Sequence, residues 1–149
     1  MRKEIKKMDN IIRNIQAVLT VIGGAIGYFI GGLDGLMIVL LVLMSIDYIT
    51  GVMCGIVDKK LSSKVGFLGI CRKVLILLLV GIANILDVNI IQTGSMLRSA
   101  TLFFYISNEG VSILENAAKL GLPIPKKIKD VLEQLHDTSE EKSDENDEE

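Results

Sequence analysis

The sequence is poor in the residues that most catalytic centres use. Among 149 residues there is no tryptophan, one histidine and two cysteines. Because His136 is the only histidine, catalytic dyads, triads and metal clusters built on histidine are excluded. The thiols of Cys54 and Cys71 make no metal site by themselves. There is also no phosphate-binding glycine loop and no nucleophile beside a base. We therefore expect neither an enzyme nor a bound cofactor or metal.

What the chain has instead is long apolar segments. Half of the residues are hydrophobic, and they form blocks of nearly bilayer length, whereas a soluble helix seldom stays apolar on every face for so long. A helix of about 20 residues crosses the ~30 Å hydrocarbon core. The sequence therefore predicts an all-α integral membrane protein with about four transmembrane helices in one domain, residues 15–120. The predicted spans are residues 15–33, 35–57, 74–91 and 97–120.

Basic residues are distributed in a way that predicts the topology. Five Lys/Arg residues lie in a leader, residues 1–14, five in the central loop that ends at Lys73, and five from Lys119 onward, but none in the turns at 31–35 and 92–95. The positive-inside rule then places both termini and the central loop in the cytoplasm. Three spans would put one basic segment outside. The leader and first span resemble a signal peptide, but the apolar run is long for one and further spans follow.

The segment after the fourth span is expected to be cytoplasmic. Pro123 and Pro125 end the helix, and apolar residues at helical spacing predict a short amphipathic helix within residues 121–136. This helix would lie on the anionic inner leaflet or pack on a neighbouring chain. Residues 137–149 hold eight acidic side chains and one lysine and no apolar residue, so we expect a disordered acidic tail, either solubilising or regulatory.

Glycines recur at every fourth position in the first two spans. In lipid, such a strip lets another helix backbone approach closely, and the resulting van der Waals contact favours association. The partner is either a helix of the same chain or a helix of another copy. The glycines in question are Gly23, Gly27 and Gly31 in the first span and Gly51 and Gly55 in the second.

Two carboxylates lie near the centres of predicted spans, Asp47 in the second and Glu109 in the fourth. A central Asp costs roughly 2.5–3.5 kcal/mol to insert, and Glu is expected to be similar, so these groups should face protein or water rather than lipid. We interpret their surroundings as the lining of a hydrated passage or as a hydrogen-bonded seam between helices. The predicted polar face comprises Asp47, Asn108, Glu109, Ser112, Glu115 and Asn116.

Arg98 is the one basic residue near the predicted outer surface. Asp34 and Asp87 lie at a similar depth, and an ion pair between Asp87 and Arg98 would explain the presence of a cation there. This interpretation predicts that Arg98→Ala has the same effect as Asp87→Ala.

Three stretches resemble the phage holin family, which also contains the toxin-secretion holins. The likeness covers roughly residues 40–136, and its most specific part is an Asn-Glu and Ser-Ile-Leu-Glu-Asn run followed by Gly-x-Pro-x-Pro. The first stretch comprises residues 47–51 and 62–66, the second residues 69–73 and Asp87, and the third residues 108–116 and 120–125.

The resemblance implies a lysis-timing protein that catalyses no reaction. Such proteins accumulate and oligomerise in the bacterial cytoplasmic (inner) membrane, then permeabilise the lipid bilayer at a set time. An endolysin thereby reaches the cell wall, or a large toxin leaves the cell, and neither needs to bind the holin directly. An antiholin would be an inhibitory partner. No nucleic acid is expected, because the positive-inside topology already accounts for the basic residues.

Two other functions remain open. One is a small proton-coupled transporter that uses Asp47 and Glu109, which inverted repeats would support, although the two halves show no convincing similarity. The other is a membrane anchor whose C-terminal helix recruits a cytoplasmic partner. Expression in bacteria together with an endolysin separates both from a holin.

Overall fold

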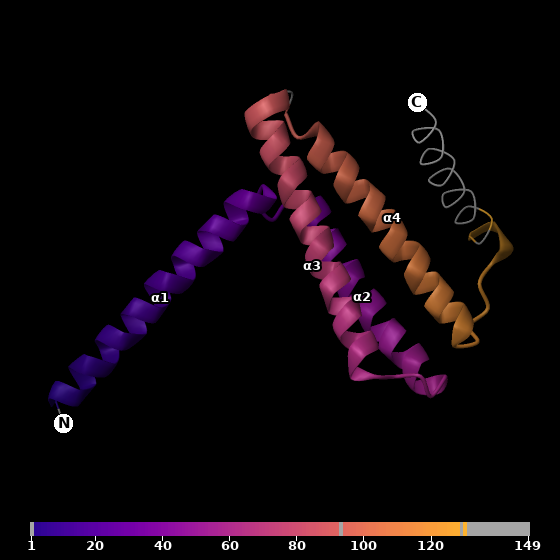
Figure 1. Cartoon of the computed structure of the whole chain (residues 1–149), viewed down its shortest axis with the longest axis horizontal. Coiled ribbons are helices and arrows are strands. Elements are labelled where there is room, and N and C mark those ends of the chain that lie inside the picture. The colour runs from indigo at the N-terminus through magenta and orange to yellow at the C-terminus, as the bar shows by residue number, and fades with distance from the viewer. Residues whose placement is uncertain (1, 93, 129, 131–149) are drawn as a thin grey trace.

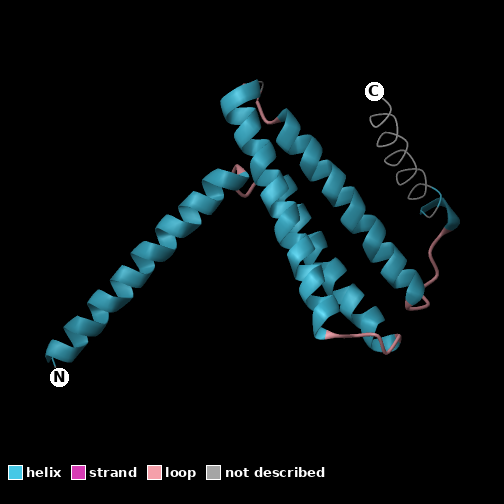
Figure 2. Ribbon diagram, in the orientation of Figure 1, coloured by secondary structure: helices cyan, strands magenta, loops and turns pink. Residues whose placement is uncertain are grey.

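The computed structural model describes residues 2–92, 94–128 and 130, and in that part of the chain all regular secondary structure is helical (Figure 2). The prediction of an all-α protein is confirmed. The elements in chain order are α1 (Arg2–Ile30), α2 (Gly35–Val57), α3 (Ser63–Leu86), the π-helical segment η1 (Asp87–Ile91) and α4 (Met96–Lys119).

Three helices lie side by side and the fourth diverges from them (Figure 1). Helices α2, α3 and α4 pack along their lengths, whereas α1 meets the others only near its C-terminal end and then runs away from them. The start of α1, the α2–α3 connection and the end of α4 all lie toward one end of the molecule. The basic segments of the sequence therefore gather at that end.

Within residues 2–92, 94–128 and 130, three helices are long and apolar enough to cross a membrane, namely Lys7–Ile30, Gly35–Val57 and Ser63–Ile91. Together they make this a membrane protein of several spans. Helix α4 has 24 residues, or about 36 Å of helix, which is long enough to cross, but its polar side chains leave it outside that group. A fourth span therefore remains a prediction.

The helices begin earlier than the predicted spans where polar residues precede an apolar run. Helix α3 begins at Ser63 rather than at residue 74, because the Ser62 hydroxyl accepts a hydrogen bond from the Val65 N–H at 3.3 Å and caps the helix. Helix α1 likewise includes the predicted leader from Arg2 onward. Only α2 has the predicted bounds, 35–57, with Asp34 as its cap.

Little of the predicted C-terminal region lies within the described residues. Residues 126–128 are helical, and the Ile128 N–H donates to the Pro125 carbonyl at 2.9 Å. The rest of the predicted amphipathic helix, apart from Asp130, and the whole acidic tail lie outside the described residues.

The helices enclose a compact apolar layer. Leu40, Val80 and Leu102, one from each of α2, α3 and α4, are completely buried. Most other large apolar side chains point outward, which suits a lipid solvent rather than water. Polar side chains lie on both sides of the apolar layer. The layer consists of Ile30, Met37, Leu40, Met44, Ile76, Val80 and Leu102.

Candidate functional site

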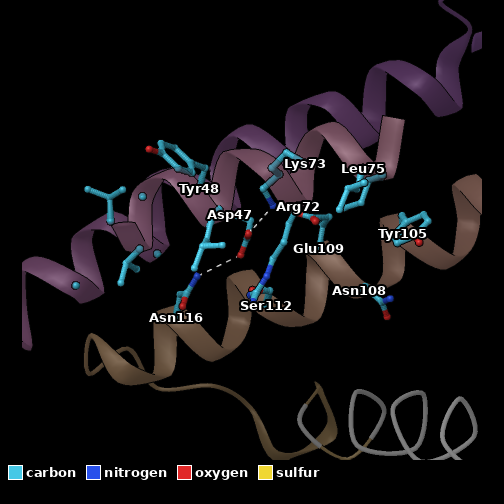
Figure 3. Close-up of a pocket in the computed structure, with 18 of the residues that line it drawn as sticks. Asp47, Tyr48, Arg72, Lys73, Leu75, Tyr105, Asn108, Glu109, Ser112 and Asn116 are labelled. Atoms are coloured by element: carbon cyan, nitrogen blue, oxygen red, sulfur yellow. Dashed lines mark hydrogen bonds and ion pairs between the residues drawn. The ribbon is translucent and has the colours of Figure 1, made fainter. Parts of the chain in front are cut away.

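A lysine joins two carboxylates in the interior of the three-helix unit. Lys73 on α3 donates from Nζ to Asp47 Oδ2 on α2 at 2.6 Å and also pairs with Glu109 Oε2 on α4 (Figure 3). The exposed fractions of the three side chains are 16% for Lys73, 16% for Asp47 and 8% for Glu109. Two carboxylates therefore share one ammonium, and each of the three helices contributes one titratable group.

Asn116 extends this network by two turns along α4 from Glu109. Its Nδ2 donates to Asp47 Oδ1 at 3.3 Å and to Thr50 Oγ1 at 3.1 Å. Its backbone carbonyl accepts from the Cys54 thiol at 3.4 Å. Asp47 thus has a partner on each carboxylate oxygen, as a buried charge requires. We call Asp47, Lys73, Glu109 and Asn116 the inner cluster.

The inner cluster borders a cleft of about 890 Å³ between α2, α3 and α4. Tyr48 lies across it, close enough to Gly66 and Gly69 of α3 that a Cβ on Gly69 would come within 3.4 Å of the ring. Figure 3 shows the Arg72 side chain running from α3 toward Ser112 on α4. The lining of the cleft therefore combines polar and charged side chains with apolar ones.

A second buried polar group lies at the opposite end of the apolar layer. Arg98 on α4 is 3% exposed. Its Nε donates to the Ile30 carbonyl at 2.7 Å, one terminal nitrogen to Asp34 Oδ2 at 2.5 Å, and the other to the Gly32 carbonyl at 3.1 Å. The guanidinium thereby holds the α1–α2 turn against α4. The hydrogen bond from Arg98 lowers the pKa of Asp34 below its usual value.

The predicted ion pair between the side chains of Asp87 and Arg98 is wrong. The Asp87 carboxylate instead accepts from the backbone N–H groups of Leu97, at 3.1 Å, and Arg98, at 2.7 Å. Asp87 therefore caps the start of α4, where four N–H groups lack helical partners. The carboxylate partner of the Arg98 side chain is Asp34.

Asn84 and Gly81 fix the end of α1 on α3. Asn84 Nδ2 donates to the carbonyls of Tyr28, at 3.1 Å, and Phe29, at 3.0 Å. The Phe29 ring lies over Gly81 so closely that a Cβ there would come within 2.0 Å of it. Gly31, with φ +80°, then turns the chain toward α2. We call Asp34, Asn84, Asp87 and Arg98 the outer cluster.

The two clusters lie closer together than the faces of a bilayer core. Asp34 and Asp47 are thirteen residues apart on α2, and Arg98 and Glu109 are eleven apart on α4, which corresponds to roughly 17–20 Å of helix. A hydrocarbon core is ~30 Å thick. A protein that crosses such a core therefore carries at least one of the clusters at hydrocarbon depth, shielded from lipid by its own helices.

The predicted polar face divides into two parts in the structure. Glu109 and Asn116 are buried and Asp47 and Ser112 half-buried, so these four point toward the inner cluster and the cleft. Asn108 and Glu115 are exposed, and Asn108 also contributes to the lining of the cleft. The face thus includes both a seam between helices and an outward polar surface.

The predicted glycine strips have different surroundings. A Cβ on Gly23 or Gly27 would meet nothing within 4 Å in the described part of the chain, so these positions pack against none of the described helices. Gly31 is surrounded by Asn84 and Arg98, Gly55 faces Leu61, and a Cβ on Gly51 would meet only Asn116 Nδ2, at 3.8 Å. Packing within the chain therefore does not account for the strip on α1.

The predicted sites do not include four residues that form the two clusters or hold α1 on α3, namely Asp34, Lys73, Gly81 and Asn84. The sequence assigns Lys73 to the basic edge of the central loop, because the apolar run starts at residue 74. The Ser-x-x-Val start of a capped helix at Ser62 is the feature that would have placed Lys73 inside α3.

Comparison with known proteins supports the resemblance to the phage holin family. The model of the family described as "Bacteriophage holin family" matches residues 24–137. A 14.9 kDa protein in the nagH 3′ region of Clostridium perfringens is 43% identical over 87% of this chain and 98% of its own length. A protein of Bacillus phage phi105 named "Probable holin" is 41% identical over 72% of this chain and 79% of its own length. Bacillus subtilis YqxH is 40% identical over 76% of this chain and 80% of its own length. No solved structure matches the chain.

Proposed function

Because this chain belongs to the bacteriophage holin family, we propose that it is itself a holin. Copies accumulate and oligomerise in the bacterial cytoplasmic membrane, with both termini in the cytoplasm, and form lesions at a set time. The lesions release an endolysin, which causes host cell lysis, or a large toxin. The family match and the probable holin of a Bacillus phage support the role. The observation that carries the mechanism is the inner cluster, in which one lysine pairs with two carboxylates inside membrane-length helices.

The packing of the chain indicates that one copy cannot form the lesion. The apolar layer is closed, since Leu40, Val80 and Leu102 are fully buried, and it leaves no passage between α2, α3 and α4 for a folded protein. A lesion large enough for an enzyme therefore requires many copies. The exposed polar side chains of α4 and the exposed surface of α1 are candidate surfaces for contacts between them.

The inner cluster explains how copies can accumulate without damage. Because Lys73 pairs with both Asp47 and Glu109, each carboxylate has a cationic partner within its own chain. This partial compensation and the low exposure of the three side chains keep most of their polar surface away from lipid. Asn108 and Glu115 remain outside that compensation. In a crowded assembly these side chains gain water or polar partners that lipid does not supply, which favours the assembled state over dispersed copies.

Coexpression with an endolysin that lacks its own export signal tests the function. We expect growth to stop at a reproducible time, followed by release of a cytoplasmic marker enzyme that depends on the endolysin. Glu109→Gln and Gly27→Leu should each shift that time at equal expression, and Lys59→Gln in the α2–α3 connection serves as control. Unchanged timing in both variants would contradict the proposed role of the two sites.

A small proton-coupled transporter is the second candidate, favoured by the three titratable side chains that meet in the inner cluster. An anchor for a cytoplasmic partner is the third. Neither predicts endolysin-dependent lysis. Growth to normal density with the endolysin retained inside would therefore exclude the holin and leave these two.

A further inference from the structure

Helix α1 is a membrane-length helix with almost no partner among the described residues of its own chain. None of its apolar window, Lys7–Ile30, is buried, and its contacts with the other helices are confined to its last turns (Figure 1). In addition, Asp9 and Arg13 form no ion pair within the described part of the chain. We infer that α1 is a docking arm that packs on the outward face of α4 of a second copy. This inference rests on the membrane orientation in the proposed function.

The receiving surface is a groove between α3 and α4 that no segment of the described chain fills. It has a volume of about 420 Å³ and is mostly apolar. Its α4 wall includes Ala100, Thr101 and Phe104, and the Phe104 ring is 48% exposed. The same face of α4 continues at steps of three or four residues through Asn108 and Val111 to Glu115 and Lys119. The groove thus forms the apolar part of a longer surface, next to the first half of α4. The part of this surface near the C-terminal end of α4 carries charges.

A chain's own α1 does not lie on this groove. It contacts α3 through Gly81 and Asn84, whereas Leu79, Ile82 and Leu86 line the groove. At 100° per residue these two sets lie on nearly opposite sides of α3. The hydrogen bonds from Asn84 and Arg98 hold the end of the arm on the first side. An arm in the groove must therefore come from a second copy.

The contact within one chain fixes the register of such docking. Arg98 Nε donates to the Ile30 carbonyl at 2.7 Å, so the end of α1 and the start of α4 lie at one level. Copies with a common orientation in one bilayer share that level. In the proposed contact the arm lies antiparallel along α4 of the second copy, and both helices have the same rise per residue. Each step back along α1 is then level with one step forward along that α4.

This register pairs complementary side chains along the whole surface. Small residues of α1 meet the residues that line the groove, polar meets polar, and opposite charges meet near the cytoplasmic end. All the α1 members share one face of the helix at steps of three, four or seven residues, as do the α4 members. The level pairs are Gly27 with Thr101, Gly24 with Phe104, Thr20 with Asn108, Arg13 with Glu115, and Asp9 with Lys119.

The contact joins two different surfaces, so its geometry has a consequence for assembly. Each copy offers one arm and one groove, on opposite sides of α3. A contact between unlike surfaces does not end at a dimer and instead propagates into a ring or an open chain. The docking arm therefore supplies a route from single copies to the large assemblies that a lesion requires.

Cysteine cross-linking tests the register. In a Cys54→Ser/Cys71→Ser background, Gly24→Cys combined with Phe104→Cys should form disulfides in native membranes and give a ladder that extends beyond the dimer. Each single variant should give none, and Gly24→Cys with Phe103→Cys, a neighbouring position on a different face of α4, should give several-fold less. Dimers from Gly24→Cys alone would indicate a two-fold contact between arms and would overturn the inference. So would the absence of any ladder in the pair.

Charge reversal provides an independent test. Arg13→Glu and Glu115→Arg should each reduce higher oligomers several-fold, and the double variant should restore them. Lys7→Glu, on the opposite face of α1, is the matched control and should have no such effect. A double variant no better than the single ones would contradict the pairing. Lysis without a ladder would overturn only the docking arm, whereas a ladder without lysis would overturn the holin function.

Discussion

Lys73 on α3 and Asp47 on α2 form an ion pair with 2.6 Å between Nζ and Oδ2, although the residue before the apolar run would be expected at a loop edge. The pair, together with Glu109, ties α2, α3 and α4 to one another through their charges. Two hydrogen-bonded clusters lie at opposite ends of the apolar layer. The inner cluster joins α2, α3 and α4, and the outer cluster holds the C-terminal end of α1 against them.

Replacing Lys73 by Met should destabilise the protein strongly. The substitution leaves two carboxylates in a half-buried or buried site without their cation, and removal of one partner from a buried pair costs about 3–5 kcal/mol. Adding Asp47→Asn and Glu109→Gln should recover much of the loss, because no uncompensated charge then remains. Chemical unfolding in detergent measures both effects. Lys64→Met, at an exposed position near the start of α3, is the control.

Gly81→Ala should displace the Phe29 ring, since the new Cβ would lie within 2.0 Å of a ring carbon. Overpacking of this kind costs about 1–3 kcal/mol. Combining it with Phe29→Ala should remove the clash, so a double-mutant cycle should give a large coupling energy. Gly110→Ala meets nothing within 4 Å and should be nearly neutral. Coupling near zero would mean that Phe29 does not lie over Gly81 in the membrane.

Asp87→Ala and Arg98→Ala should act nearly independently. The first removes a helix cap, worth about 0.5–2 kcal/mol, whereas the second leaves the Ile30 and Gly32 carbonyls without donors, at about 1–3 kcal/mol each. The backbone N–H that Asp87 binds survives in Arg98→Ala. The double variant should therefore be less stable than either single one. A double variant equal to the worse single would indicate a direct pair between the two side chains.

The contact between Arg98 and Asp34 should make stability depend on acidity. The folded state has the lower pKa at Asp34, so this contribution is complete above the ordinary Asp pKa of about 3.9 and is lost as the pH falls through the lower folded-state value. Asp34→Asn should reduce the fall in Tm between about pH 5 and about pH 3. The change should be small, because the Asp34 side chain is 48% exposed and water screens the pair. Asp58→Asn, at the end of α2, is the control, and an equal change there would assign the effect to general charge.

The sequence predicts the parts of the fold that depend on composition and periodicity. The bounds of α2 and the positions of Asp47 and Glu109 inside helices follow from long apolar runs interrupted by single charges. The start of α3 depends instead on one capping hydroxyl, that of Ser62, which a hydropathy pattern does not reveal. That difference alone moves Lys73 from a loop into the interior.

Other features depend on contacts between distant segments. Arg98 has several candidate partners by depth, and only the path of the α1–α2 turn brings Asp34 and two carbonyls to its guanidinium. Gly81 is one small residue in an apolar run, and its role exists only because Phe29 covers it. The divergence of α1 likewise cannot be predicted from the spacing of apolar residues, because that spacing determines the faces of a helix but not its angle to other helices.

Leakage from vesicles tests the central claim, that copies of this chain permeabilise a membrane collectively, most directly. Purified protein would be reconstituted at increasing density into sealed vesicles that contain dextrans of graded size. We expect no release at low density and, above a threshold, abrupt release of dextrans as large as a folded enzyme. Vesicles that stay sealed at every density, or that release only ions in proportion to the amount of protein, would contradict the account.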